Sequence, residues 1–363
     1  MDRHDVSETV TAENVAQIHQ EDLKIQDQFG CRGLTYWFDD KRKTAFCLIE
    51  APDAEAIRKM HDKAHGQVPH RVIEVNASIV ESFLGRIEDP EKVDNTELNI
   101  INDPAFRTIM VIRLRRLLLR QDDPAQFQSS LQHFNSTILN VLANYEGKPV
   151  RQSENHFLVS FKSVTNAVHA ALAVRSLFHE TWKGINGNTV LLKIALSAGV
   201  PVTEKELIFE STIKLAERMS RIVKGEIIIS SEVKELYNSE NVRALHEDDS
   251  TFLLTETDEE FLTLLMDYTE SSWTNANLKV DDFSKPVGCS KSQLYRRIIV
   301  LTGNSPNTFI KEYRLSEALS LLNKKNSNVS EIAYETGFTS PSYFSKCFQK
   351  RYGQLPSDYV PAR

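Results

Sequence analysis

The chain of 363 residues is longer than a single domain usually is, so two or three separately cored units are expected. Hydrophobic residues make up 41% of the chain and charged residues 26%, which excludes a disordered or membrane-embedded protein. The net charge of −7 argues against a nucleic-acid partner for the chain as a whole. Residues 274–363, however, contain 13 Lys and Arg against 7 Asp and Glu, a local net charge of +6, which leaves −13 for the remainder.

The four cysteines form no C-x-x-C pair, so neither a disulfide framework nor a zinc knuckle is indicated. Residues 1–5 contain no apolar segment of the kind found in signal peptides, and no stretch approaches the ~20 apolar residues of a membrane span. A cytoplasmic location without a membrane partner is expected.

Residues 1–90 are predicted to form a small α+β domain. The expected elements are a helix over 10–29, strands over 34–38 and 44–50, a helix over 53–65 and a strand over 71–75. The polar turn from Asp39 to Arg42 joins the first two β-rich runs into a hairpin. This order suggests a ferredoxin-like sandwich, whose first strand must come from the few residues before Val6.

Four histidines lie in or beside this domain: His4, His61, His65 and His70. His61 and His65 share one face of the predicted helix and could chelate a transition metal, or could both be exposed helical residues. Cys47 lies in an apolar run and is predicted to be a small buried hydrophobe. The segment GLTYWFDDKRKTAFCLIEAPDAEAIRKMHDKAHG, within residues 15–75, resembles a small family of ferredoxin-like domains in which nickel binding has been described. The resemblance implies nickel or another transition metal as a candidate cofactor.

A polar stretch over residues 88–104 offers little apolar surface to bury and is predicted to be a linker. Over residues 105–256, strands alternate with helices of 12 to 20 residues, which predicts an α/β domain. The expected strands lie at 108–114, near 150, and at 157–161, 190–198 and 225–230, and the expected helices at 125–144, 164–179 and 210–222.

The segments GKPVRQSENHFLVSF, NAVHAALAVRSL, LLKIALSAGV and STIKLAERMSRIVKGEIIISSEV resemble, in diverged form, a class III nucleotidyl cyclase domain. In that family two aspartates hold divalent metals, and Arg113 and Asn155 occupy those positions here. A cation cannot bind a metal and a neutral amide binds one poorly. Of the Asn and Arg that the family aligns with Lys214 and Arg218, only the arginine is retained. The resemblance therefore implies a catalytically inactive domain.

Two interpretations of this domain remain open. It is either a purely structural dimerisation module, or a dimerisation and sensor module that binds a nucleotide or another anionic effector through Arg113, Lys214 and Arg218.

From residue 277 onward the pattern is wholly helical, after an acidic helix over 259–271. Ile332 and Ala333 form an apolar helix face, Gly337 supplies a positive φ, and aromatic residues anchor the next helix, which is a helix-turn-helix pattern. The pattern also appears about fifty residues earlier, over 280–297, with a long helix over 306–322 between the two copies. In the earlier copy, Pro286 is expected to end the first helix early.

The segments SKSQLYRRI, TGNSPNTFIKEYRLSEALSLL and VSEIAYETGFTSPSYFSKCFQKRYGQLPSDY closely resemble the AraC/XylS family of DNA-binding domains over residues 277–359. The resemblance implies two recognition helices, over 290–302 and 340–352, that lie in the major groove of double-stranded promoter DNA. Leu294 and Ile298 are expected to pack inward. Gln and Arg would contact bases, and Lys would mostly contact phosphates. The candidate DNA-binding residues are Ser290, Lys291, Gln293, Arg296, Arg297, Ser340, Ser342, Tyr343, Lys346 and Lys350.

The sequence therefore predicts a bacterial, nucleoid-associated transcription regulator with three domains, over residues 1–90, 105–256 and 274–363. It is expected to form a homodimer, to respond to a metal or small-molecule effector, and to have no enzymatic activity; RNA polymerase is a further candidate partner. The alternatives are a nucleotide cyclase linked to DNA binding and a dedicated metal-responsive repressor.

Overall fold

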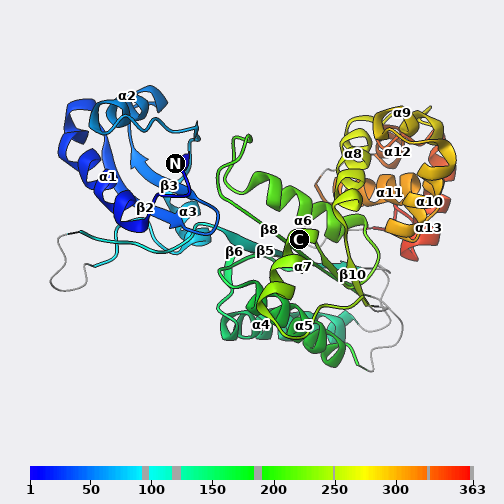
Figure 1. The fold of residues 1–363 in the computed structure, drawn as a ribbon. Coiled ribbons are helices and arrows are strands. Elements are labelled where there is room, and N and C mark those ends of the chain that lie inside the picture. Colours follow the sequence, from blue (N-terminus) through cyan, green and yellow to red (C-terminus); the bar gives the residue numbers. More distant parts are fainter. Residues whose placement is uncertain (92–97, 117–123, 184–189, 248–249, 325–327, 360–363) are drawn as a thin grey trace.

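The computed structural model describes residues 1–91, 98–116, 124–183, 190–247, 250–324 and 328–359. The chain forms an N-terminal α+β part, a central part built on a larger sheet, and a helical C-terminal part (Figure 1). Within the described ranges, none of the helices combines the length and the apolar run that a membrane crossing needs.

The N-terminal part contains a four-stranded sheet with the order β2-β3-β1-β4. Neighbouring strands in this sheet are antiparallel, and the first strand does come from the residues before Val6. The β-α-β-β-α-β order of the elements is the one used by ferredoxin-like domains. The strands are β1 (Asp2–Asp5), β2 (Arg32–Asp39), β3 (Thr44–Glu50) and β4 (Arg71–Val72), and the helices are α1 (Ala12–Ile25), η1 (Gln26–Phe29), α2 (Ala54–Ala64) and α3 (Ala77–Leu84).

The segment predicted to be a linker packs against the N-terminal sheet. The Tyr36 hydroxyl donates to the Asn99 carbonyl at 2.9 Å and accepts from the Ile101 N–H at 2.9 Å, and the Ile101 side chain is 4% exposed. The expectation that this stretch buries little apolar surface is therefore wrong at Ile101. The Tyr36 hydroxyl forms hydrogen bonds with the backbone groups of Asn99 and Ile101, and this allows the segment to lie against the sheet with the Ile101 side chain buried. Residues 92–97 of the predicted linker lie outside the described residues.

The central part is a six-stranded mixed sheet with the order β10-β9-β8-β5-β7-β6. The pairs β5–β7, β5–β8 and β6–β7 are antiparallel, whereas β8–β9 and β9–β10 are parallel. Its strands are β5 (Arg107–Arg116), β6 (Lys148–Ser153), β7 (His156–Phe161), β8 (Val190–Gly199), β9 (Ile227–Ile229) and β10 (Thr251–Leu253). Its helices are α4 (Pro124–Asn144), α5 (Val164–Thr181), α6 (Glu210–Ile222) and α7 (Ser231–Glu240).

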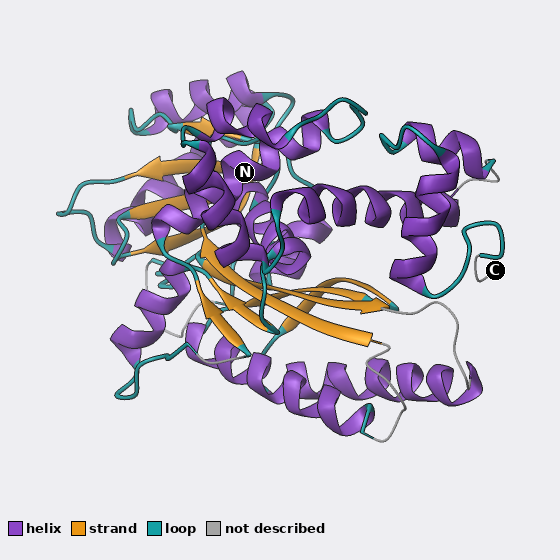
Figure 2. Cartoon of the chain, turned by 90° about the vertical axis from the view of Figure 1, so that its right-hand side faces the viewer, coloured by secondary structure: helices purple, strands orange, loops and turns teal. Residues whose placement is uncertain are grey.

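Helices cover both faces of this sheet (Figure 2). Alternation along β5 sends Met110 and Ile112 into a core shared with α4 and α5, and Ile109 and Val111 into a core shared with α6. The strand and helix alternation predicted from the sequence is therefore present. The elements α7 and β10 were not predicted.

The C-terminal part begins after the acidic helix α8 (Glu256–Ser272), which lies beside α6 in Figure 1. Pro286 lies in the single turn α9, which ends at Gly288 with φ +65°, as expected for a helix that stops early. The elements are η2 (Val280–Phe283), α9 (Ser284–Val287), α10 (Lys291–Thr302), α11 (Pro306–Lys324), α12 (Val329–Glu335) and α13 (Pro341–Tyr352).

The largest cluster of buried side chains includes residues from all three parts of the chain. It contains Trp37 and Phe83 from the N-terminal part, Phe209 from the central part, and Phe283 and Leu294 from the C-terminal part. This continuity differs from the expectation of separately cored units, because α3 and α8 bury apolar surface against the central sheet and its helices instead of forming exposed connections.

Candidate metal centre and nucleic-acid interface

The helices α10 and α13 hold most of the predicted DNA-binding side chains on exposed faces. Eight of the ten predicted residues are exposed, and Arg297 and Ser340 are half-buried. On the opposite faces, Leu294 and Ile298 are at most 1% exposed, as predicted, and Phe344 is fully buried. The exposed residues form the two reading faces of the domain: Ser290, Lys291, Gln293 and Arg296 on α10, and Ser342, Tyr343, Lys346 and Lys350 on α13.

Serine caps begin both of these helices. The Ser290 hydroxyl accepts from the Gln293 N–H at 3.4 Å, and the Gln293 carboxamide oxygen accepts from the Ser290 N–H at 2.9 Å. The Ser340 hydroxyl accepts from the Tyr343 N–H at 3.3 Å. These caps satisfy backbone N–H groups that a helix start leaves unpaired, so the two serines have a structural role besides their predicted contact with DNA.

Arg297 points away from the reading face of α10. Its guanidinium donates to the Thr257 carbonyl of α8 at 2.5 Å, and its Cζ lies 4.2 Å from the centre of the Phe261 ring. A cation over an aromatic ring is attracted to the face of that ring. The prediction that Arg297 faces the groove does not describe this arrangement, because packing of α8 against α10 captures the side chain.

A buried histidine lies between two carboxylates in the N-terminal part. The Nε2 of His61 lies 3.0 Å from Asp2 Oδ2, and its Nδ1 lies 3.0 Å from Asp22 Oδ1. Burial alone would lower the pKa of His61, but hydrogen bonds to both carboxylates raise it to about 9. The same bonds hold the pKa of Asp22 below its usual value although burial opposes this. His65 joins the group, with its Nε2 3.1 Å from Asp22 Oδ1.

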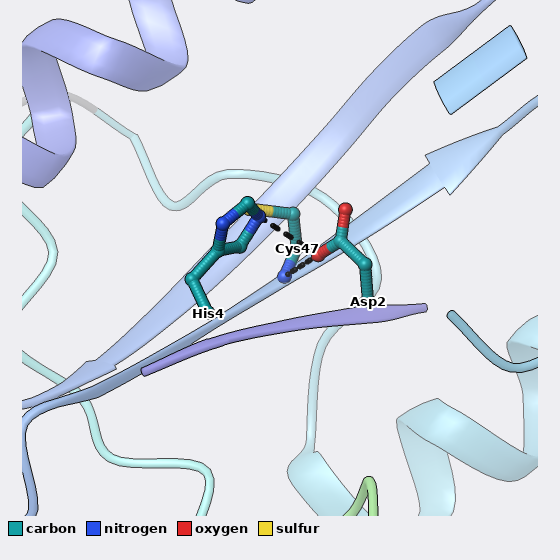
Figure 3. Close-up of side chains that lie close together, drawn as sticks. All are labelled: Asp2, His4 and Cys47. Atoms are coloured by element: carbon teal, nitrogen blue, oxygen red, sulfur yellow. Dashed lines mark hydrogen bonds and ion pairs between the residues drawn. The ribbon is translucent and has the colours of Figure 1, made fainter. Parts of the chain in front are cut away.

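A second group of potential ligands shares Asp2 (Figure 3). The Nε2 of His4 is buried without a hydrogen-bond partner and lies 3.7 Å from Asp2 Oδ1. Cys47 is buried, as predicted, and burial raises the pKa of its thiol. Its thiol nevertheless belongs to a set with His4 and Asp2 whose ligand atoms lie within 4.8 Å of one another. The ligand atoms of Asp22, His61 and His65 form a second set within the same limit.

A cavity of about 380 Å³ is lined by His4 and His61 and by two further histidines of this part, His19 and His70. His70 is exposed, and its Nδ1 accepts from the Asp5 N–H at 3.1 Å. His19 is buried, with its Nε2 3.3 Å from Asp89 Oδ2. The structure thus brings His4, His61 and His70 to one cavity and places His65 beside His61.

The sequence interpretation missed three residues of this site: Asp2, Asp22 and His19. A signal for each was present. Asp2 and His4 are two residues apart on a strand and so share one face. His19 and Asp22 continue the i, i+4, i+7 series that starts at Val15, so both polar residues lie on the apolar face of α1.

The predicted effector-binding cations of the central part line one pocket. Each of them is paired with a carboxylate. Arg113 contacts Glu217 at 2.5 Å, and Glu217 also contacts His156 at 2.8 Å. Lys214 lies 3.2 Å from Asp267, and Arg218 contacts Asp267 and Glu270 at 2.5 Å. Asn155 directly precedes β7 and lies opposite Leu114, the neighbour of Arg113 on β5, where its carbonyl accepts from the Leu114 N–H at 2.8 Å.

Comparison with protein families assigns both ends of the chain. Residues 1–75 match the family described as nickel responsive protein SCO4226-like. Residues 283–361 match a helix-turn-helix domain family, and the related proteins include several HTH-type transcriptional regulators.

Individual relatives align over parts of their length. Histidine kinase P4 of Formosa agariphila is 41% identical over 101 residues, which is 28% of this chain and 7% of that protein. The transcriptional regulator MtrA of Neisseria gonorrhoeae is 32% identical over 95 residues, which is 26% of this chain and 30% of that protein. The chain therefore spans less than a third of each of these relatives. The crystal structure of SCO4226 from Streptomyces coelicolor A3(2) is 31% identical, with a TM-score of 0.20, and covers 20% of this chain and 90% of that one.

Proposed function

Because the chain carries a C-terminal helix-turn-helix domain of the AraC type and an N-terminal domain of the SCO4226-like family, we propose that it regulates transcription by binding double-stranded promoter DNA. The observation that supports this most is the pair of capped helices whose exposed faces carry Gln293 and Arg296 on α10 and Lys346 and Lys350 on α13. Gln and Arg suit the hydrogen-bonding edges of bases, and Lys suits phosphates. Residues 274–363 act as the DNA reader in this proposal.

The test is binding of the full chain to fragments of DNA from upstream of its own gene, at two salt concentrations. Arg296→Ala is expected to reduce discrimination between the best fragment and random DNA by about 5- to 150-fold, because a lost base contact is worth about 1–3 kcal/mol. Lys346→Ala is expected to weaken binding to both DNAs alike. Lys183→Ala, at an exposed position of the central part, is the matched control and should change neither. Absence of selective binding by the wild-type chain would refute the proposal.

The N-terminal domain is proposed to be the sensor of a transition metal, with Ni²⁺ as the first candidate. The residues fit such an ion: imidazole nitrogens suit nickel, and the buried Nε2 of His4 has no hydrogen-bond partner. Asp22, His61 and His65 would hold the metal in one set and Asp2, His4 and Cys47 in a second, and His70 would close the mouth of the cavity. A bound metal would supply a fixed positive charge between Asp2 and Asp22. In the metal-free protein, the His61 imidazolium supplies the positive charge at this place.

This part of the proposal is tested by calorimetric titration of the full chain with Ni²⁺ and Zn²⁺. His65→Gln is expected to weaken metal binding at least tenfold while leaving DNA binding without metal unchanged. His133→Gln, an exposed histidine of α4, is the control. Metal affinity that is equal in the two variants would remove the cluster from the proposed site.

The central part is proposed to be a structural and dimerising module without cyclase activity, which transmits the state of the sensor to the DNA reader. Arg113 stands at a position that would need a metal-binding carboxylate, and Glu217 neutralises it. Formation of a cyclic nucleotide from ATP or GTP by the full chain with Mn²⁺ would overturn this part. Sedimentation of the chain as a monomer at micromolar concentration would overturn the dimer.

A further inference from the structure

A second polar cavity, of about 230 Å³, lies between the central part and the DNA-reading domain. One wall comes from β5, β8 and α6, and the other from α11 and α13, so residues far apart in the sequence meet there. Four cations and one carboxylate line it, together with apolar side chains. The charged residues are Arg115, Lys193, Arg221, Arg351 and Glu312, and the apolar ones include Ile222, Val223 and Phe309.

Two of the four cations are already paired. Arg351 Nε lies 2.6 Å from Glu312 Oε2. Arg221 forms an ion pair with Glu317 and donates to the Tyr313 hydroxyl at 3.2 Å, and its Cζ lies 4.1 Å from the centre of the Tyr313 ring. The Arg221 contacts hold α11 against the central part, and the Arg351–Glu312 pair joins α13 to α11.

The other two cations, Arg115 and Lys193, contact backbone carbonyls. Arg115 donates to the Arg221 carbonyl at 3.3 Å, and Lys193 donates to the carbonyls of Val223 at 2.7 Å and Gly225 at 2.6 Å. Within the described ranges neither has a carboxylate within ion-pair distance. The hydrogen bonds of these two side chains therefore go to carbonyl dipoles, and the carboxylates that act on them, Glu312 on Arg115 and Glu226 on Lys193, lie beyond ion-pair distance.

Burial of these two charges is unfavourable. Burial lowers the pKa of Arg115, and the neighbouring cation Arg351 lowers it further. Burial also lowers the pKa of Lys193, to about 8, and Arg115 adds to that effect. Half-buried like charges without an ion-pair partner destabilise a fold, and groups kept under such conditions in a cavity are candidates for ligand binding.

We propose that this cavity binds the phosphate group of a small organic phosphate, held by Arg115 and Lys193. The planar guanidinium can donate two hydrogen bonds to one phosphate, and the ammonium adds a point charge. The apolar side chains Ile222, Val223 and Phe309 would contact the organic portion. The site differs from the Arg113, Lys214 and Arg218 group predicted from the sequence, in which each cation already has a carboxylate partner.

The position of the cavity makes the ligand an effector of DNA binding, and this step rests on the proposed function. A phosphate that contacts Arg115 also lies near Arg351, which belongs to α13, the second reading helix. A ligand that binds one arrangement of the two parts more tightly than another shifts the population toward that arrangement, and DNA affinity changes by the same factor in return.

The test is calorimetric titration of the full chain with inorganic phosphate and with adenosine monophosphate, using adenosine as the uncharged probe. Phosphate and the monophosphate are expected to bind and adenosine is not. Arg115→Gln and Lys193→Gln are each expected to weaken binding at least tenfold, whereas Lys193→Arg, which keeps the charge, and Lys183→Gln, the exposed control, retain it. Thermal melting of each variant identifies any that fail to fold.

The outcomes separate this site from the proposed function. Failure of both phosphate probes to bind at millimolar concentration, or equal affinity in wild type and Arg115→Gln, overturns the site and means that the two cations only cap the carboxyl end of α6. Phosphate binding by a chain that binds no DNA supports the site and overturns the regulator. Phosphate binding that leaves DNA affinity unchanged overturns the coupling alone.

Discussion

Gly337, in the turn of the second helix-turn-helix motif, allows a direct measurement of how closely that turn is packed. Its φ is +77°, and a Cβ at this position would lie 2.8 Å from the Trp273 carbonyl oxygen and 2.9 Å from Arg314 Nε. Arg314 is not free to withdraw, because its guanidinium donates to the Trp273 carbonyl at 2.9 Å and to the Asn275 carbonyl at 2.7 Å. Gly288 is the matched position in the first motif, with φ +65° and no atom within 4 Å of a Cβ.

The two positions separate the cost of backbone strain from the cost of steric overlap. An alanine in the left-handed region costs about 1–2 kcal/mol, and loss of glycine flexibility in the unfolded chain returns about 0.4–1 kcal/mol. Gly288→Ala should therefore destabilise the protein by about 1 kcal/mol. Gly337→Ala adds an overlap with backbone, for which overpacking costs of about 1–3 kcal/mol apply, so a total of about 2–4 kcal/mol is expected.

Urea unfolding of the full chain, followed by tryptophan fluorescence, measures both variants. Trp273 is a local probe, because its own carbonyl is the group that the new methyl would meet. Gly337→Ala should also weaken DNA binding more than Gly288→Ala, since the overlap pushes the turn before α13 away from Trp273. Equal loss of stability in the two variants would mean that the turn is not packed as closely as described, and the reasoning would fail.

Three further predictions concern buried or charged groups. Arg107 is 1% exposed and donates to the carbonyls of Phe83, Leu84, Pro104 and Phe106. Arg107→Met leaves these carbonyls without their donor and should lower the free energy of unfolding by about 3 kcal/mol or more. An unchanged midpoint of urea unfolding would contradict this prediction. Lys350→Ala should reduce the slope of log DNA affinity against log salt concentration by about 1, because one phosphate contact is lost. The slope is measured with promoter DNA at salt concentrations from about 50 to about 200 mM. Phosphate affinity should fall as pH rises through about 8, because Lys193 then loses its charge: burial and, next, Arg115 lower the pKa of Lys193 to about 8, while Glu226 opposes them. An identical pH profile in Lys193→Gln would argue against this assignment.

Periodicity was sufficient to predict most of the long elements. The helix expected over 210–222 is α6 with the same bounds, and the two recognition helices begin within one residue of the expected positions. The apolar face of α10 was predictable because Leu294 and Ile298 are four residues apart on one side of the helix. Short elements escaped prediction: α3 has eight residues, and its apolar residues are buried by the central part, which no local pattern reveals.

The composition of the sites depended on contacts between distant segments. His61 was identified from its spacing to His65, but its strongest partners, Asp2 and Asp22, come from β1 and α1. Arg297 had the residue type and position of a base-reading side chain. Its contact with the Phe261 ring depends on the packing of α8 against α10, which the sequence pattern does not reveal. Arg115 and Lys193 look like ordinary strand charges in the sequence, because their cavity exists only when α11 and α13 pack against the central part.

The buried cluster that runs from Trp37 through Phe209 to Leu294 has a consequence for how the protein melts. Since buried side chains of the three parts pack in one cluster, loosening one part exposes apolar surface of the next, and the parts are expected to unfold as a single cooperative unit with one heat-absorption peak. A ligand bound in the N-terminal cavity would then raise the melting temperature of the reading helices as well as that of the N-terminal part. Expression of the reading domain alone would remove α8, whose Tyr268 ring lies 4.9 Å from the Phe283 ring, so the isolated fragment should aggregate more readily than the full chain.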